Sequence, residues 1–78
     1  MDALTLPHMA HGTATCLEDK VNVRAHPTLK AAIYGQLRQG EEVIVFALDQ
    51  GWMIVQAENG LTGWVAVQYL KVIGDLVA

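Results

Sequence analysis

Residues 51–65 of this chain read GWMIVQAENGLTGWV, and this stretch decides the fold. Short apolar runs flank Asn59-Gly60, a dipeptide typical of a tight turn between antiparallel strands. The hexamer Gly-Trp-x-x-Val-Gln occurs at Gly51–Gln56 and again at Gly63–Gln68. A single duplication at this spacing predicts a pair of sister strands, not a solenoid repeat.

Further strands are predicted on both sides of this pair. Val21-Asn22-Val23-Arg24 alternates apolar and polar residues, which predicts a half-buried strand with both valines inward. Pro27 cannot donate to a strand ladder, so a loop is expected there. The remaining expected elements are a short β-prone piece at 13–17, the loop at 25–32, a strand at 33–38 with Leu37 in the core, strands at 41–48, 52–57 and 61–67, a single helical turn at 67–69 and a closing strand at 70–73. No segment has a convincing helical period, so the sequence predicts an all-β fold.

The order of several short motifs in this chain resembles the signature of bacterial SH3 (SH3b) domains. The residues that carry the resemblance are Val21-Asn22-Val23-Arg24, Gly40, Gly51-Trp52, Asn59-Gly60, Gly63-Trp64-Val65 and Tyr69-Leu70. The resemblance implies a small SH3-like barrel of five to seven short antiparallel strands. It also implies an inward-facing set made of Val21, Val23, Leu37, Val43, Val45, Val55, Val65 and Leu70. We therefore expect a flexible N-terminal arm at 1–12, the barrel at 13–73 and a C-terminal tail at 74–78.

Composition narrows the choice of partners. The chain has 78 residues, enough for one domain, and a net charge of −3. Its five Lys and Arg residues are scattered, which argues against nucleic acid or an anionic membrane as a partner. No stretch is apolar enough for a membrane span or a secretory signal. As written, the sequence is expected to be cytoplasmic; as a fragment of a longer protein it would be extracellular or phage-borne.

No cofactor, metal site or catalytic centre is predicted. Cys16 is the only cysteine, so it forms no disulfide within the chain and is expected to be a small buried hydrophobe. His8, His11 and His26 could be grouped with it, but their spacing fits no regular zinc pattern. A Cys16–His26 nucleophilic pair would also need an orienting group and a pocket. The chain is therefore not expected to be an enzyme.

The β-hairpin at 41–57 is apolar on both of its faces. A three-residue loop, Asp49-Gln50-Gly51, would set Leu48 opposite Trp52, Phe46 opposite Ile54 and Ile44 opposite Gln56. One face would then carry Ile44, Phe46, Leu48, Trp52 and Ile54, and the other Val43, Val45, Ala47, Met53, Val55 and Ala57. A sheet with one solvated face should instead alternate apolar with polar residues.

Something is therefore expected to cover the outer face of this hairpin. Two alternatives are open. The arm (Leu4, Leu6, Met9) or the tail (Leu76, Val77) folds over it, or a partner protein does.

Trp52 and Tyr69 match the positions at which SH3-like barrels flank a ligand groove. The alternative is that both are packing residues of the barrel rim. Together with Ile44, Phe46, Ile54 and Trp64 they form the predicted partner-binding set. The first functional hypothesis is a non-catalytic interaction module that docks onto a protein partner, in a homo-oligomer or larger assembly. The alternative, implied by the resemblance, is a module that binds cell-wall peptides of peptidoglycan for a wall-associated or phage protein.

Overall fold

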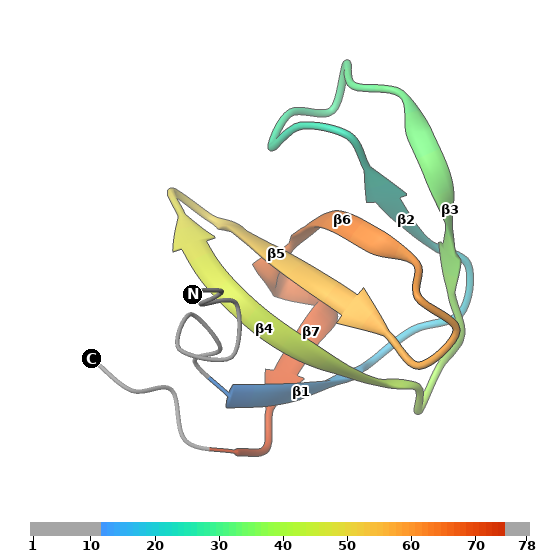
Figure 1. The fold of residues 1–78 in the computed structure, drawn as a ribbon, viewed down its shortest axis with the longest axis vertical. Helices are drawn as coiled ribbons and strands as arrows, with labels where there is room; N and C mark the ends of the chain where they lie inside the picture. Colours follow the sequence, from blue (N-terminus) through green and yellow to red (C-terminus); the bar gives the residue numbers. More distant parts are fainter. Residues whose placement is uncertain (1–11, 75–78) are drawn as a thin grey trace, which may run out of the picture.

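Within residues 12–74, seven strands and one turn of 3-10 helix make up the fold (Figure 1). A computed structural model of the chain describes residues 12–74. The elements are β1 (Gly12–Cys16), β2 (Val21–Arg24), β3 (Ile33–Leu37), β4 (Glu42–Asp49), β5 (Trp52–Ala57), β6 (Thr62–Ala66), η1 (Val67–Tyr69) and β7 (Leu70–Val72). All strand pairs are antiparallel, and the described part of the chain holds no α-helix. The all-β prediction and the single helical turn before the last strand are confirmed.

The strands form one sheet in the order β3-β2-β6-β5-β4-β1-β7. Figure 1 shows this sheet coiling around a small interior, with β1 and β7 crossing one end beneath β4 and β5. The eight residues predicted to point inward are all buried, with Leu70 the most exposed of them at 7%. Ala14, Cys16, Met53 and Ala57 complete the core. The inward-facing set that the SH3b resemblance implies is thus confirmed.

The loop between β5 and β6 has the predicted three-residue form. The amide of Gly60 donates to the carbonyl of Ala57 at 2.9 Å, and the amide of Ala57 donates to the carbonyl of Leu61 at 2.8 Å. Gly60 has a φ of 94°, in the left-handed region. The turn therefore ends on a left-handed residue, which glycine adopts without steric cost.

The β4–β5 loop differs from the prediction: it has two residues, not three. Asp49 pairs with Trp52, and Leu48 pairs with Met53. The loop residues Gln50 and Gly51 have φ values of 45° and 92°. Two consecutive left-handed residues make a type I′ turn, whose twist matches that of the strands it joins.

A β-bulge at Phe46 then restores the predicted pairing further along the hairpin. The register shifts between Val45 and Ala47, so Ala47 pairs with Ile54 while Val45 pairs with Val55. The predicted pairing of Ile44 with Gln56 is confirmed, but those of Leu48 with Trp52 and of Phe46 with Ile54 are wrong. Because paired residues share a face, Leu48 lies on the side of buried Met53 and Ala47 on the outer side.

The two glycines of the repeated hexamer serve different physical needs. Gly51 is needed for its positive φ. A Cβ on Gly63 would lie 2.6 Å from the carbonyl oxygen of Arg24 and 2.7 Å from a methyl carbon of Val23. The backbones of β2 and β6 therefore approach too closely for a side chain at this position, where the two strands pair through Arg24 and Trp64.

The predicted flexible arm and tail concern residues that lie almost wholly outside the described range. Only Gly12, the first residue of β1, and Gly74 belong to it. The alternative in which Leu4, Leu6, Met9, Leu76 or Val77 covers the outer face thus also rests on residues outside 12–74.

Candidate functional site

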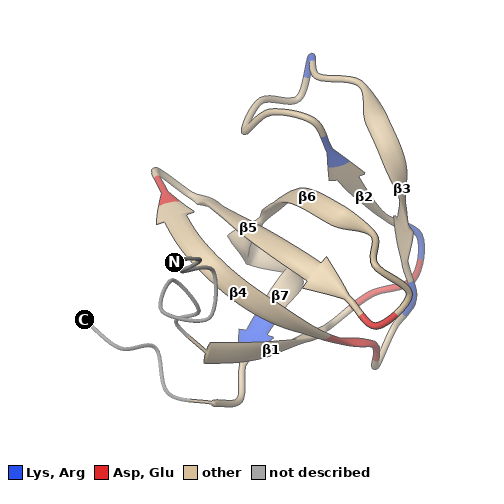
Figure 2. Cartoon of the chain, in the orientation of Figure 1, with Lys and Arg blue, Asp and Glu red and all other residues tan. Residues whose placement is uncertain are grey.

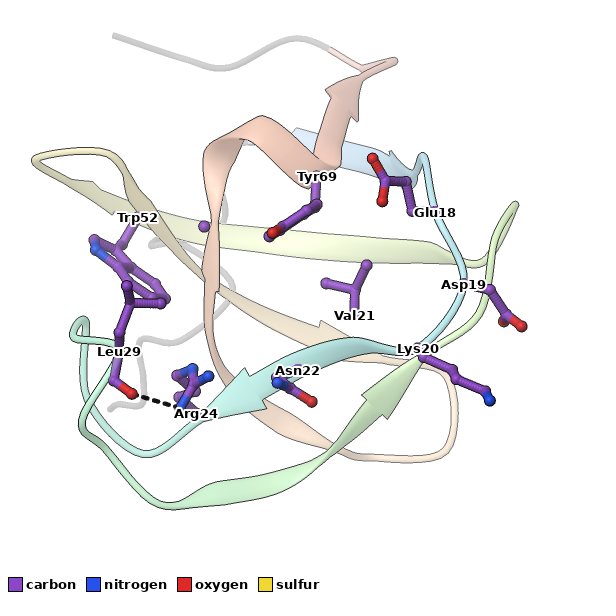
Figure 3. A pocket seen from close by; sticks show the side chains of 10 residues that line it. Glu18, Asp19, Lys20, Val21, Asn22, Arg24, Leu29, Trp52 and Tyr69 are labelled. Carbon is purple, nitrogen blue, oxygen red and sulfur yellow. Dashed lines mark hydrogen bonds between the residues drawn. The ribbon is translucent and has the colours of Figure 1, made fainter.

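A groove of about 160 Å³ opens on the surface formed by β2, the loop at 25–32 and the start of β5 (Figure 3). Its lining comes from six parts of the chain. The turn after β1 gives Glu18, Asp19 and Lys20, and β2 gives Val21, Asn22 and Arg24; the rest are Leu29, Trp52, Ala66 and Tyr69. The volume lies below the 300–1,000 Å³ of sites that enclose drug-sized ligands. The groove therefore suits partial contact with an extended chain.

Trp52 and Tyr69 line this same groove, although they are distant in sequence. Trp52 is the first residue of β5, and Tyr69 is the last residue of η1. In Figure 3 the Trp52 indole lies beside Leu29 at one end of the groove, and the Tyr69 ring points into its middle. Both side chains are half-buried, so each has one part packed and one part open to a ligand.

Arg24 fixes the loop that forms one wall of the groove. Its Nη1 donates hydrogen bonds to the carbonyl oxygens of Leu29 at 2.9 Å and Ala31 at 3.0 Å. The amide of Ala25 donates to the carbonyl of Ala32 at 2.9 Å, which closes the loop at its base. Held in this way, Leu29 is 75% exposed next to the groove. Neither Arg24 nor Leu29 was predicted from the sequence as a site residue.

The family of this chain is settled by residues 19–71, which match the family model described as bacterial SH3 domain. This chain belongs to the bacterial SH3 domain family. The match covers more than half of the 78 residues. The resemblance proposed from the sequence is confirmed.

One curated relative of this SH3b domain comes from Bacillus subtilis (strain 168). It bears the name "Putative N-acetylmuramoyl-L-alanine amidase YrvJ" and is 34% identical over 56 residues. The aligned region is 72% of this chain but 11% of that protein. The SH3b domain thus corresponds to a small part of a much longer relative.

The other predicted partner-binding residues lie on the outer face of the sheet, away from the groove lining. Ile44 is 42% exposed, but its cross-strand neighbours are Thr13 and Gln56, which are polar. Ile54 is half-buried between Ala47 and Trp64. The predicted face is therefore not continuous: Ile44 stands among polar residues, whereas Ile54 and Trp64 form a cross-strand apolar pair.

The positions of Phe46 and Leu48 differ from those predicted for this face. Phe46 is half-buried at the bulge, where it has no directly paired partner on β5. Leu48, which was predicted on the outer face, is on the core side of the hairpin and 55% exposed near its tip. The reason in both cases is the combination of a two-residue turn and a bulge, which leaves the predicted register only between Val43 and Val45.

Cys16 is a buried core residue, as predicted, with an exposed fraction of 1%. Its thiol donates to the carbonyl of Glu18, with an Sγ–O distance of 3.2 Å. Burial raises the pKa of the Cys16 thiol, and the negative charges of Glu41, Glu18 and Asp19 raise it further, whereas the hydrogen bond lowers it. A thiol with a raised pKa in the core is a poor nucleophile.

Within residues 12–74, no group of three or more His, Cys, Asp or Glu side chains could hold a metal ion. No helix in the same range is long and apolar enough to cross a bilayer. His8 and His11, two of the histidines weighed as metal ligands, lie outside it.

Proposed function

We propose that this SH3b domain is a non-catalytic module that binds cell-wall peptide in the groove between Trp52 and Tyr69. The observation that supports this proposal is that two amphipathic aromatic side chains, Trp52 from β5 and Tyr69 from η1, line one shallow groove. The name of the relative supports the class of ligand, because an N-acetylmuramoyl-L-alanine amidase acts where peptidoglycan joins sugar to peptide. In this account the domain works at the wall, the extracellular setting considered for a fragment of a longer protein.

The groove chemistry is consistent with a peptide. Trp52, Leu29 and Ala66 offer apolar surface at one end, where small side chains or α-carbons can pack. Glu18 and Asp19 lie at the opposite end in Figure 3 together with Lys20, so two negative charges face one positive charge there. This balance would favour a free ammonium group of a peptide. Asn22 supplies an amide between the two ends.

Sedimentation with purified peptidoglycan tests this proposal. The wild-type domain should pellet with the wall material, and Trp52→Ala and Tyr69→Ala should each weaken binding at least tenfold, as expected for central aromatic contacts. Ile44→Lys, on the outer sheet face, is the matched control and should bind like the wild type. The proposal fails if all three variants pellet equally, or if the wild type stays in solution.

A second candidate function is docking onto a protein partner through the outer face of the sheet. The observation in its favour is the apolar row Ala47–Ile54–Trp64 across three strands, with Phe46 and the exposed Ile44 nearby. Light scattering as a function of concentration tests self-association. A mass above that of one chain which falls to one chain on Ile44→Lys with Ile54→Lys would favour this candidate.

A further inference from the structure

The β3 strand forms an open edge of the sheet. Among the described residues it pairs only with β2, and it stands at one end of the strand order. Figure 1 shows β3 on the outside of the molecule, with β2 on its inner side. Its sequence, Ile-Tyr-Gly-Gln-Leu, contains no charged residue and no proline, two of the devices that protect an edge from pairing. A third device, a β-bulge, is confined to Tyr34 and leaves Gly35–Leu37 in regular pairing with β2. The edge is thus suited to receive another strand.

The outer surface at this edge is apolar. Ile33 is 52% exposed and Tyr34 is 62% exposed. The register shifts here, because Val23 pairs with Gly35 and Arg24 with Ile33, which leaves Tyr34 without a directly paired residue. Leu29 extends the exposed apolar surface into the preceding loop. An added strand could therefore contact side chains as well as backbone groups.

Charge indicates what kind of strand would bind. Residues 20–38 hold four of the five basic residues of the chain and no Asp or Glu, in a protein of net charge −3. These residues are Lys20, Arg24, Lys30 and Arg38. Figure 2 shows blue segments, which mark Lys and Arg, on the ribbon that contains β2 and β3. Their charges are not equally available. Arg24 donates to two loop carbonyls, and Lys20 and Arg38 line hollows together with Asp19, Glu41 or Glu58. Lys30 lies in the loop between β2 and β3, a segment without Asp or Glu.

We propose that the β3 edge (Ile33–Leu37) binds an extended acidic polypeptide segment by strand addition, with the acidic side chains directed towards the Lys30 end. Main-chain hydrogen bonds to β3 would supply affinity, and Lys30 would supply the preference for acidic side chains. A second copy of this chain is a poorer occupant, because pairing β3 with itself would bring two basic ribbons together. Nucleic acid has no strand backbone to continue the ladder.

The test is an NMR titration of the 78-residue chain with a short capped peptide of alternating glutamate and valine. A matched peptide of alternating lysine and valine is the control. We expect saturable binding of the acidic peptide only, with new protection from amide exchange within Ile33–Leu37. Lys30→Glu should weaken binding roughly threefold or more, while Lys71→Glu, the same charge change on β7, should leave it unaltered.

Four results would overturn the proposal. The acidic peptide could fail to bind at millimolar concentration, or bind with shifts confined to Trp52 and Tyr69. Duplex DNA could bind more tightly than the acidic peptide, with shifts at the same basic residues. Alternatively, the chain alone could dimerise with protection at β3, which would make a second copy the occupant.

Discussion

Arg24 and Leu29 are joined by a hydrogen bond of 2.9 Å from the guanidinium Nη1 to the carbonyl oxygen. The same nitrogen also holds the carbonyl of Ala31, so one side chain of β2 fixes two points of the loop. Leu29 can remain exposed beside Trp52 because its backbone, not its side chain, is what anchors it. The wall of the groove thus depends on a residue whose own charge is directed into the loop.

Removing this anchor should loosen the loop without unfolding the barrel. Arg24→Met retains the apolar stem but removes the donor, and we expect a loss of about 1 kcal/mol in the free energy of unfolding. Amide exchange should accelerate at residues 29–31, and Lys71→Met is the control for loss of a positive charge. Unchanged exchange in the loop of Arg24→Met would show that the anchor is not needed.

Gly63 should tolerate a methyl group far less well than Gly35. At Gly63 the added carbon meets the backbone of Arg24 at 2.6 Å, and we expect Gly63→Ala to destabilise by roughly 2–3 kcal/mol. At Gly35 the near atoms belong to the end of the Leu61 side chain, which can move, so Gly35→Ala should cost about 1 kcal/mol or less. Urea unfolding of the two variants measures the difference. Equal losses would contradict the close approach of β2 and β6.

The type I′ turn predicts a stabilising substitution. Gln50 has a φ of 45°, which costs a residue with a Cβ energy unless its side chain is suited to the left-handed region. Gln50→Asn, which gives the favoured Asn-Gly pair, should stabilise the fold by about 0.5 kcal/mol. Gly51→Ala should destabilise it by about 1 kcal/mol. The measurement is the urea midpoint at constant slope, and a lower midpoint for Gln50→Asn would argue for the three-residue loop.

Burial of the Cys16 thiol should make the folded domain less stable at alkaline pH. Its pKa in the folded state is raised, so above the unfolded value of about 8.5 the unfolded chain loses the thiol proton while the folded one keeps it. The free energy of unfolding must then fall as pH rises from about 8.5, and be unaffected by this group at lower pH. Cys16→Val should flatten that part of the profile. Parallel profiles for the variant and the wild type would show that the burial of the thiol has no such effect.

Much of the barrel could be predicted from the sequence because its core residues alternate with polar ones. Val21 and Val23 lie in a strand whose other positions, Asn22 and Arg24, are polar, so period and burial agree there. The turn at Asn59-Gly60 could be predicted because only the last residue of this three-residue loop must be left-handed, and that residue is Gly60. These features are local, and local chemistry decides them.

The β4–β5 hairpin could not be predicted in full because neither of its faces is polar. Asp49-Gln50-Gly51 permits both a three-residue loop and a two-residue loop with a bulge, and either one pairs Ile44 with Gln56. The sequence gives no indication of the bulge at Phe46, because residues 43–48 are all apolar and no residue type in this run marks the position. The anchoring of the loop by Arg24 was missed for another reason, since it depends on a tertiary fold that brings a strand residue under a loop.

The most direct test of the proposed function is an NMR titration of the domain with a soluble peptide fragment of peptidoglycan. The account predicts saturable shifts of the Trp52 indole and of residues around Tyr69 and Leu29, abolished by Trp52→Ala and retained in Ile44→Lys. Shifts confined to Ile44, Ile54 and Trp64, or no shifts at millimolar peptide, would contradict it.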